Sequence, residues 1–491
     1  MHRQEYFLVD NMLQIEPTRI ERDLLGEKQI PLHSYYGIHT LRAIENFQIS
    51  GLAIGQQSHF ICALAQVKKA SAQTNLHFQK ISEQTSTVIQ KACNELIQHP
   101  ENWQAAFPLD PYQGGAGTSI NMNANEVIAN IALELLGHHK GEYHILHPND
   151  HVNTSQSTND VYPTALRLAT YSSLNELLAV LKALIDCLYM KAAEFQYVIK
   201  MGRTQLQDAV PMTMEQEFRA FATLLKEDLK LIEQMRQLLL EVNLGATAIG
   251  TGVNTPPGYA TRVVETLAHL TGLPLKGAED YVEATSDCGV FIILSSSLKR
   301  LAVKLSKICN DLRLLSSGPR TGLAEIRLPE LQAGSSIMPA KINPVIPEVV
   351  NQIAFRVIGN DLTITMAAEA GQLQLNVMEP VIALTMNESI QLLTQGMQTL
   401  NQKCIAGIQA NEEICLSSVM RSVGIVTLLE PILGHAKCDE IGKQCMRENK
   451  TVPQVVLELG LLSETQLEEI FAFENLVSEI PVAESQLEQV S

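Results

Sequence analysis

Residues 334–344 gather the groups that catalysis requires, reading Gly-Ser-Ser-Ile-Met-Pro-Ala-Lys-Ile-Asn-Pro. Gly334 permits backbone angles closed to other residues, and the two prolines remove hydrogen-bond donors, so this stretch is predicted to be a loop. Lys341 and Asn343 could grip a carboxylate while a serine sits where a proton must move. From residue types alone, the stretch is either an anion clamp or a plain surface turn between two helices.

A second stretch, residues 114–126, places glycines directly before a predicted helix. Thr118 or Ser119 stands near the N-cap of that helix, where unpaired backbone N–H groups point outward and form a seat for an anion. Glycines before a helix are common, so this stretch could also be no more than a helix cap.

A third stretch, residues 147–160, contains a single aliphatic side chain and would be costly to bury without ligands or partners. Ser157, Thr158 and Asn159 supply hydroxyl and amide groups ahead of another predicted helix. The two histidines and Asp150 raise the question of a metal site, but we predict no tight catalytic metal here.

A fourth stretch, residues 202–209, contains Thr204 and Gln205 and by itself indicates only a polar turn between two helices. All four stretches stand at the ends of predicted helices and offer mainly neutral donors. The chain shows no convincing Ser-His-Asp or Cys-His arrangement, no P-loop and no dinucleotide fingerprint. Together the stretches suit the binding of a small polyanion and the stabilisation of extra negative charge on it as a proton leaves.

The composition is that of a globular protein with a large core. The chain has 491 residues, 46% hydrophobic and 18% charged, which allows about two to four domains. A formal net charge of −17 disfavours a nucleic-acid partner, which would need a basic face. No apolar run reaches the roughly 18 residues that span a bilayer, and the N-terminus lacks the apolar centre of a signal peptide. The lack of such a run predicts no membrane partner, and nine scattered cysteines predict a reduced, cytoplasmic location.

Long helical patterns dominate the chain beyond Pro163. The clearest covers 214–242, where apolar residues recur every three or four positions and predict a helix on the order of 40 Å long. With few strand signals, the long patterns predict an all-α bundle, and their extensive apolar faces favour oligomerisation. The other predicted helices cover 58–75, 81–98, a segment from Ser119, 165–198, 289–316, 347–375 and 380–409.

The domain organisation is predicted from where these patterns begin and end. Residues 1–22 form an N-terminal arm, 23–160 an N-terminal domain, 161–409 a central helical bundle domain and 410–491 a small C-terminal domain. Residues 23–47 are turn-like and polar-aromatic, and an acidic, loosely patterned tail begins at 477.

Residues 334–344 resemble GSSxMPxKxN, the signature of the fumarase/aspartase superfamily. The other three stretches resemble regions of the same superfamily in its order and approximate spacing, and the similarity runs from about Asp23 to about 475. The resemblance implies a mainly α, three-domain fold and a homotetramer whose core holds about twenty helices, five per subunit. It further implies that three subunits build each active site and that the 334–344 loop is a mobile lid.

The chemistry implied by the resemblance is an anti-elimination that requires no cofactor. Ser335, as an alkoxide, would take the C3 proton of L-aspartate and leave an enediolate on the β-carboxylate, after which ammonia leaves C2 and fumarate remains. Cationic Lys341 and the N–H donors of the loop would favour the ionised serine. By family position, the remaining contacts are Thr118, Ser157, Thr158 and Ser336 to the β-carboxylate, Lys341, Asn343 and Thr204 to the α-carboxylate, Asn159 to the ammonium group, and Glu348 behind a neighbouring acid/base residue.

Gln205, counted among the substrate-binding residues, bears on the branch of the superfamily. Fumarases carry histidine at this position, where it helps to handle the proton on a departing hydroxyl. A protonated amine leaves as neutral ammonia and needs no such acid, and glutamine cannot titrate. Residues 283–289 and Arg42 also resemble the aspartase branch, and Arg42 is expected near the site. That branch is often activated by a divalent cation, so activation by Mg²⁺ is expected, with no ligands assigned.

Two alternatives stay open. One is a fumarate hydratase, which Gln205 disfavours, and the other is a tetrameric scaffold without catalysis, which the complete set of site residues disfavours.

The segment that begins at His147 resembles that of the fumarases, in which the segment corresponding to residues 147–150 belongs to a second anion site outside the catalytic pocket. Thr154 stands where relatives usually carry lysine, so both positions concern accessory binding.

Overall fold

A computed structural model describes residues 17–477, which divide into two compact units. Within the described range, unit 1 comprises residues up to 175, 234–296 and 359–390, and unit 2 comprises 176–233, 297–358 and 391 onward. Most of the predicted N-terminal arm and acidic tail lies outside the described residues. The division into an arm and three domains stays a prediction.

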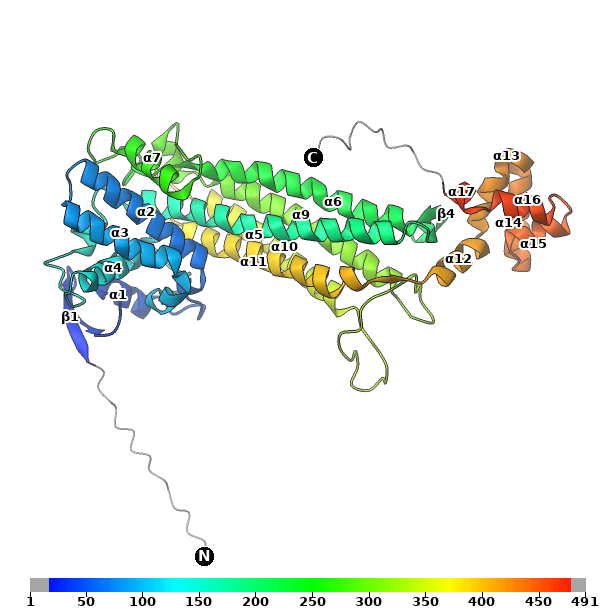
Figure 1. Cartoon of the computed structure of the whole chain (residues 1–491), viewed down its shortest axis with the longest axis horizontal. Helices are drawn as coiled ribbons and strands as arrows, with labels where there is room; N and C mark the ends of the chain where they lie inside the picture. The colour runs from blue at the N-terminus through cyan, green and yellow to red at the C-terminus, as the bar shows by residue number, and fades with distance from the viewer. Residues whose placement is uncertain (1–16, 478–491) are drawn as a thin grey trace, which may run out of the picture. The chain divides into compact units, whose positions relative to one another are not determined.

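Five long helices, labelled in Figure 1, run through the chain. Each contributes residues to both compact units. The mainly helical fold and the existence of these helices are confirmed. Helix α6 is shorter than predicted, because after Met235 the chain tightens into a 3₁₀ turn and then pairs Val242 with Gly277 in a short parallel sheet. The five helices are α5 (Thr158–Glu194), α6 (Met214–Met235), α9 (Gly289–Leu315), α10 (Val345–Glu369) and α11 (Glu379–Lys403).

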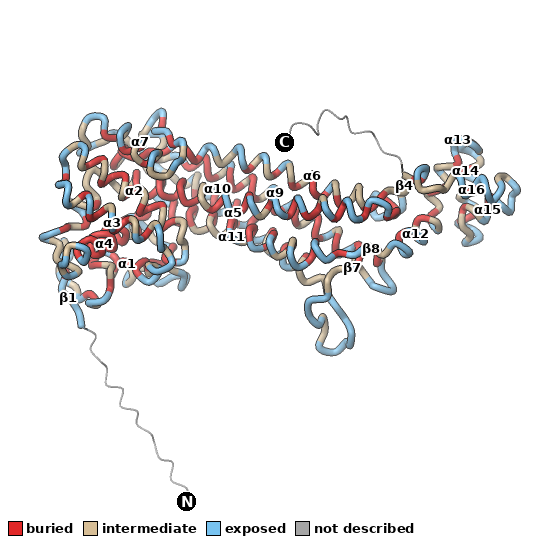
Figure 2. The backbone as a smooth tube through the Cα atoms, in the orientation of Figure 1, coloured by how far each residue is buried: buried red, intermediate tan, exposed pale blue. Residues whose placement is uncertain are grey.

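In unit 1, a layer of shorter helices surrounds α4 (Thr118–Leu135), which is buried along nearly its whole length (Figure 2). Helix α2 (Ser58–His77) packs against α3 (Glu83–Gln98) and α7 (Tyr259–Thr271). Helix α4 nevertheless carries buried asparagines and a glutamate among its apolar residues. Buried amides need hydrogen-bond partners, so α4 holds other segments as well as filling the core.

Regular structure replaces the turn-like segment predicted at 23–47. Strands β1 (Thr18–Asp23) and β2 (Gly26–Pro31) form an antiparallel hairpin, and α1 covers Ile38–Asn46. The prediction failed because the first N–H groups of α1 are held by distant carboxylates. Ile38 N–H donates to Glu21 at 2.8 Å, and His39 N–H donates to Glu126 at 2.8 Å.

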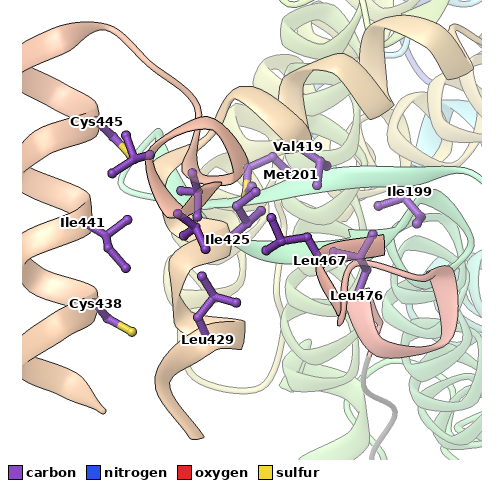
Figure 3. Close-up of a cluster of buried hydrophobic side chains, with 13 residues drawn as sticks. Ile199, Met201, Val419, Ile425, Leu429, Cys438, Ile441, Cys445, Leu467 and Leu476 are labelled. Atoms are coloured by element: carbon purple, nitrogen blue, oxygen red, sulfur yellow. The ribbon is translucent and has the colours of Figure 1, made fainter. Parts of the chain in front are cut away.

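The predicted turn at 202–209 is also wrong in detail, because it is the end of a hairpin in unit 2. Strands β3 (Ile199–Thr204) and β4 (Gln207–Thr213) pair in antiparallel fashion. Ile199 and Met201 of β3 enter the hydrophobic core of the C-terminal segment (Figure 3). Lys200, Gly202 and Arg203 interrupt the apolar pattern of this short strand, so it could not be recognised from the sequence.

The C-terminal segment of unit 2 is built from short helices around that core, which includes Val419, Ile425, Ile441 and Val455. Capping boxes begin α15 and α16, with Thr451 and Ser463 as the cap residues. The remaining elements are α8 (Tyr281–Ser286), β7 (Ile326–Arg327), β8 (Gln409–Ala410), α12 (Glu412–Arg421), α13 (Glu430–Leu433), α14 (His435–Glu448), α15 (Val452–Glu458), α16 (Glu464–Ile470) and α17 (Phe473–Leu476).

Between residues 17 and 477, no single helix is long and apolar enough to cross a membrane, although the bent pair 412–421 and 423–433 passes on length and composition. All nine cysteines are free.

The β3–β4 hairpin is tied to the segment that leads into the 334–344 loop by a buried carboxylate. Glu325 is 0% exposed and lies 2.6 Å from Arg203 Nη1 and 3.2 Å from Lys200 Nζ. Lys200 also lies 2.7 Å from Glu217 of α6. Since Glu325 directly precedes β7, this ion-pair cluster fixes strand β3, from near its start to near the hairpin tip, against the start of the loop segment.

Glu325→Gln is expected to lower the free energy of unfolding by about 3 kcal/mol, because it leaves Arg203 without its carboxylate and leaves the buried Lys200 with Glu217 as its remaining partner. The melting temperature should fall clearly below that of Glu330→Gln, a matched change at an exposed position five residues later. Equal melting temperatures for the two variants would contradict this role for Glu325.

Candidate active site

The first predicted site residue, Thr118, begins α4 in unit 1. The preceding residue, Gly117, has φ of 83°, and a Cβ there would lie 2.2 Å from the ring of buried Tyr162 in α5. Glycine is therefore required twice over, by its backbone angle and by the close approach of α5. The Thr118 hydroxyl donates to Gly115 O at 2.7 Å, and Thr118 is exposed. Asn121, in the first turn of α4, donates to Thr158 Oγ1 at 3.1 Å, so the start of α4 lies beside the start of α5.

Ser157, Thr158 and Asn159 form the start of α5, also in unit 1. Ser157 Oγ accepts from Asn159 N–H at 3.2 Å, and Ser157 N–H donates to Asp160 Oδ1 at 3.0 Å. This reciprocal cap satisfies backbone donors that the first turn of a helix leaves unpaired. Asp160 Oδ2 also accepts from Gly245 N–H at 3.0 Å and Thr247 N–H at 2.9 Å, and burial raises the pKa of Asp160 to about 6.

Asn159 is held from both sides by the segment that follows β5 (Glu241–Val242). Its side chain donates to Ala248 O at 2.8 Å, and its backbone carbonyl accepts from Asn243 Nδ2 at 3.0 Å. Asn243 also donates to Thr285 Oγ1 at 3.2 Å, and Thr285 lies in the 283–289 string that resembles the aspartase branch. That string therefore contacts the site segment through one intervening amide.

A buried polar cluster lies beneath Thr158. Lys68 Nζ donates to Asn153 Oδ1 at 2.8 Å and to Gln156 Oε1 at 3.0 Å, while Asn121 Nδ2 donates to Thr158 Oγ1 at 3.1 Å. Burial lowers the pKa of Lys68 to about 7. Sequence analysis missed Lys68, Asn121 and Asn153. The available signal was a lysine within the predicted helix 58–75 and the asparagines of the polar stretches 114–126 and 147–160.

Arg42 is engaged in a structural ion pair. Its guanidinium binds both oxygens of Asp23 at 2.8 Å and donates to Gly26 O at 3.2 Å, which closes the turn of the β1–β2 hairpin. The hydrogen bond from Arg42 lowers the pKa of Asp23. In the described structure Arg42 therefore positions the hairpin.

The two histidines of the 147–160 stretch accept hydrogen bonds from backbone N–H groups. Pro148–Val152 form a single π-helical turn, a form often found at functional sites. His147 Nδ1 accepts from Asn149 N–H at 3.1 Å, and His151 Nδ1 accepts from His147 N–H at 2.8 Å. Among residues 17–477, no group of three or more His, Cys, Asp or Glu side chains is arranged to hold a metal ion. Activation by Mg²⁺ stays a prediction.

Thr204 and Gln205 lie at the tip of the β3–β4 hairpin in unit 2, and both are exposed. Thr204 pairs with Gln207, so Gln205 and Leu206 form a two-residue turn with φ of 55° and 61°. A turn with both central angles positive normally carries Asn-Gly. Two ordinary side chains in left-handed geometry mark this tip as strained, and such strain clusters at functional sites.

The 334–344 loop of unit 2 closes on itself. Gly334 N–H donates to Lys341 O at 2.6 Å, and Asn343 Nδ2 donates to Gly334 O at 2.8 Å. Ser335 Oγ accepts two backbone N–H groups, from Ile337 at 3.2 Å and Met338 at 3.0 Å. The side chains of Ser336 and Lys341 are exposed. The loop thus holds Ser335 with the backbone N–H groups of Ile337 and Met338 directed at its oxygen.

Glu348 lies in the first turn of α10, where a carboxylate is favoured by the helix dipole. Its nearest cation is Arg313, at 3.9 Å. Arg313 is also directed at Asn351 Oδ1 at 3.3 Å, so Glu348 is loosely held and half-exposed at the end of the loop.

Leu206→Gly should raise the free energy of unfolding by about 0.5–1 kcal/mol, because glycine removes the cost of left-handed geometry. The matched control is Leu24→Gly in the β1–β2 hairpin, where an exposed leucine in a two-residue turn has no positive φ. That control should lose stability, as measured by chemical or thermal unfolding. A loss in both variants would contradict the assigned strain.

Comparison with known proteins places this geometry in a family. The family model described as "Lyase" matches residues 26–359, and the model described as "Fumarase C C-terminus" matches residues 425–478. Proteins named aspartate ammonia-lyase are similar over almost the whole chain. The one from Escherichia coli K12 is 59% identical, covering 94% of this chain and 96% of the relative. The one from Pseudomonas aeruginosa PAO1 is 54% identical, covering 95% and 98%.

Solved structures agree with these sequence relatives. A "fumarate lyase:delta crystallin" from Brucella melitensis, bound to cobalt, is 51% identical with a TM-score of 0.90, covering 94% of this chain and 99% of that one. The recombinant class II fumarase of Schistosoma mansoni is 34% identical with a TM-score of 0.86, covering 92% and 98%. With its signature loop, helical fold and full-length relatives, the chain belongs to the fumarase/aspartase superfamily.

Proposed function

We propose that this chain is an aspartate ammonia-lyase, which converts L-aspartate reversibly into fumarate and ammonia. The observation that carries the reaction type is the environment of Ser335, whose oxygen accepts two backbone N–H groups. The relatives named aspartate ammonia-lyase, up to 59% identical over 94% of the chain, support the choice of substrate.

Ser335 acts as the base in this proposal. A serine hydroxyl is a weak base, but hydrogen bonds to its ionised form and a nearby cation both favour the alkoxide. The N–H groups of Ile337 and Met338 supply the first effect. Lys341 supplies the positive charge, and its backbone carbonyl accepts from Gly334 N–H within the same loop. The alkoxide removes the C3 proton, and the two electrons of the C–H bond pass into the β-carboxylate as an enediolate.

The carboxylate contacts come from helix and strand ends. Thr118, Ser157 and Thr158 belong to helix starts, where backbone N–H groups and hydroxyls favour a carboxylate that gains charge. With Ser336 they hold the β-carboxylate, whereas Thr204, Lys341 and Asn343 hold the α-carboxylate. Asn159 contacts the ammonium group through its remaining oxygen, because its amide N–H already donates to Ala248.

Loss of ammonia is favoured over loss of water because Gln205 occupies the strained hairpin tip. Glutamine does not titrate and cannot protonate a leaving hydroxyl, whereas a departing ammonium group needs no external acid. The alternative is a fumarate hydratase, which the likeness to the class II fumarase of Schistosoma mansoni favours. A scaffold without catalysis is disfavoured by the organised loop around Ser335.

The active form in this proposal is a homotetramer with a twenty-helix core in which three subunits supply each site. Helix α10 presents Phe355, Leu362 and Met366, which are 64%, 63% and 65% exposed in the single chain. Their spacing puts them along one helix face, and such an apolar stripe needs a partner. The proposed location is the cytoplasm, where the free cysteines remain reduced. Mg²⁺ activates without a role in the chemistry.

The reaction is tested by following the ultraviolet absorbance of fumarate with L-aspartate, and separately L-malate, as the only substrate. Fumarate should form from L-aspartate alone. Formation from L-malate alone would replace this proposal with the hydratase, and formation from neither would favour a scaffold.

Ser335→Ala should lower kcat by about 10²- to 10⁴-fold, the usual contribution of a positioned base. Circular dichroism and gel filtration should show unchanged folding and assembly. Ser336→Ala is the matched control, because it removes a hydroxyl one residue away and should mainly raise KM. A kcat for Ser335→Ala close to that of the parent would remove Ser335 from the base role.

A further inference from the structure

The polar cluster beneath Thr158 has a defined hydrogen-bond direction that begins at Lys68. This side chain is 0% exposed, and its amine lies 2.8 Å from one side-chain atom of Asn153 and 3.0 Å from one of Gln156. An ammonium group has donors only, and Asn153 Nδ2 already donates to Gln156 O at 3.3 Å on the other side of the amide. The atom of Asn153 that faces Lys68 must therefore be its oxygen, which fixes the orientation of this amide.

The next amide is fixed by the first. Asn121 lies in α4 one turn beyond Thr118, is 1% exposed, and places one side-chain atom 3.3 Å from Asn153 Oδ1 and 3.1 Å from Thr158 Oγ1. Because Asn153 presents an oxygen, Asn121 must present its nitrogen. Asn125, one turn further on, donates to the same Asn153 oxygen at 3.2 Å and adds to this constraint.

The direction of the Thr158 hydroxyl follows. Its oxygen accepts the N–H of Asn121, so its own hydrogen must be donated to another group. Thr158 is the first residue of α5 and has no preceding helical carbonyl to accept that hydrogen. Among the described residues, no protein oxygen accepts it. Thr158 is also 8% exposed, so leaving this donor unpaired would be costly.

We propose that Lys68, Asn153 and Asn121 form a relay that fixes Thr158 as a hydrogen-bond donor to a substrate carboxylate, with Asn121 as the positioning residue. This inference rests on the proposed function, because the carboxylate that accepts the Thr158 hydrogen bond is the β-carboxylate of L-aspartate. As C3 is deprotonated, that carboxylate gains negative charge, and a donor already aligned needs no reorientation. Asn121 contributes without touching the substrate.

Asn123 provides a matched control within α4. It is also a fully buried asparagine, but its side chain donates to Ala106 O at 2.9 Å, outside the relay. Asn121→Ala and Asn123→Ala each remove one buried hydrogen-bonding amide from the same helix. Both should lower the melting temperature, but only the change at Asn121 should alter substrate turnover.

The decisive measurement is a double-mutant cycle between Asn121→Ala and Thr158→Val, with kcat/KM for L-aspartate as the readout. Asn121→Ala should lower kcat/KM about 10-fold when Thr158 is present, equivalent to one well-formed hydrogen bond. It should change kcat/KM less than about 2-fold when valine stands at 158, because there is no hydroxyl to direct. Asn123→Ala should stay within about 2-fold in both backgrounds.

Asn121→Asp is a near-isosteric second variant in case the alanine variant folds poorly. Its carboxylate accepts hydrogen bonds only, so it should turn the Thr158 hydroxyl inward and lower kcat/KM about 100-fold. Succinate is a dicarboxylate without an amine, and its affinity can be measured by calorimetry. This affinity should decrease from the parent protein to Asn121→Ala and again to Asn121→Asp.

Independent effects of Asn121→Ala and Thr158→Val would overturn the relay, as would an equal loss of kcat/KM in Asn123→Ala. These outcomes are distinct from failure of the proposed function. Absence of fumarate from L-aspartate in the parent protein would remove the ammonia-lyase reaction. The succinate cycle would still decide whether Asn121 directs Thr158 toward a carboxylate.

Discussion

The geometry of the site segment in unit 1 depends on the buried carboxylate of Asp160. It accepts backbone N–H groups from Ser157, Gly245 and Thr247, at 2.9–3.0 Å. A buried carboxylate is costly to desolvate, and only a full set of donors makes it tolerable. The segment that supplies Thr158 and Asn159 is therefore tied to one position, since any displacement would leave that charge without its donors.

Unit 2 is also organised by a buried carboxylate, but its hydrogen-bonding partners are of a different kind. Glu325 is held by the cations of Lys200 and Arg203 rather than by backbone N–H groups. The hairpin tip and the loop segment are both connected to this one carboxylate. In both units the anchoring carboxylates, Asp160 and Glu325, are fully buried, while the residues with proposed chemical roles, apart from Thr158, are exposed or half-exposed. These two buried carboxylates therefore hold in place the segments that carry the proposed reacting groups.

Sequence reasoning recovered the long helices because their apolar periodicity is strong and local. It also located the signature loop, since ten residues of mixed chemistry rarely coincide by chance. The β1–β2 and β3–β4 hairpins were missed because their strands are short and charged. Their stability comes from contacts with residues distant in sequence, such as Glu126 for α1 and the C-terminal core for Ile199 and Met201.

The relay residues were beyond pattern analysis for a related reason. Asn121 and Asp160 lay inside stretches already singled out, but their roles depend on which atoms face each other across α2, α4 and α5. Lys68 resembled any lysine on a helix, and only its 0% exposure shows that its amine is enclosed. A sequence indicates which residues are available for chemistry, whereas hydrogen-bond direction requires the folded contacts.

The left-handed turn at Gln205 and Leu206 has a consequence for how related enzymes diverge. Residues with branched β-carbons fit poorly at positive φ, whereas histidine and asparagine tolerate it well. Exchange between glutamine and histidine at position 205 therefore changes the acid chemistry without requiring any change in the path of the backbone. The hairpin tip can thus hold either a titratable or a non-titratable side chain on one backbone conformation.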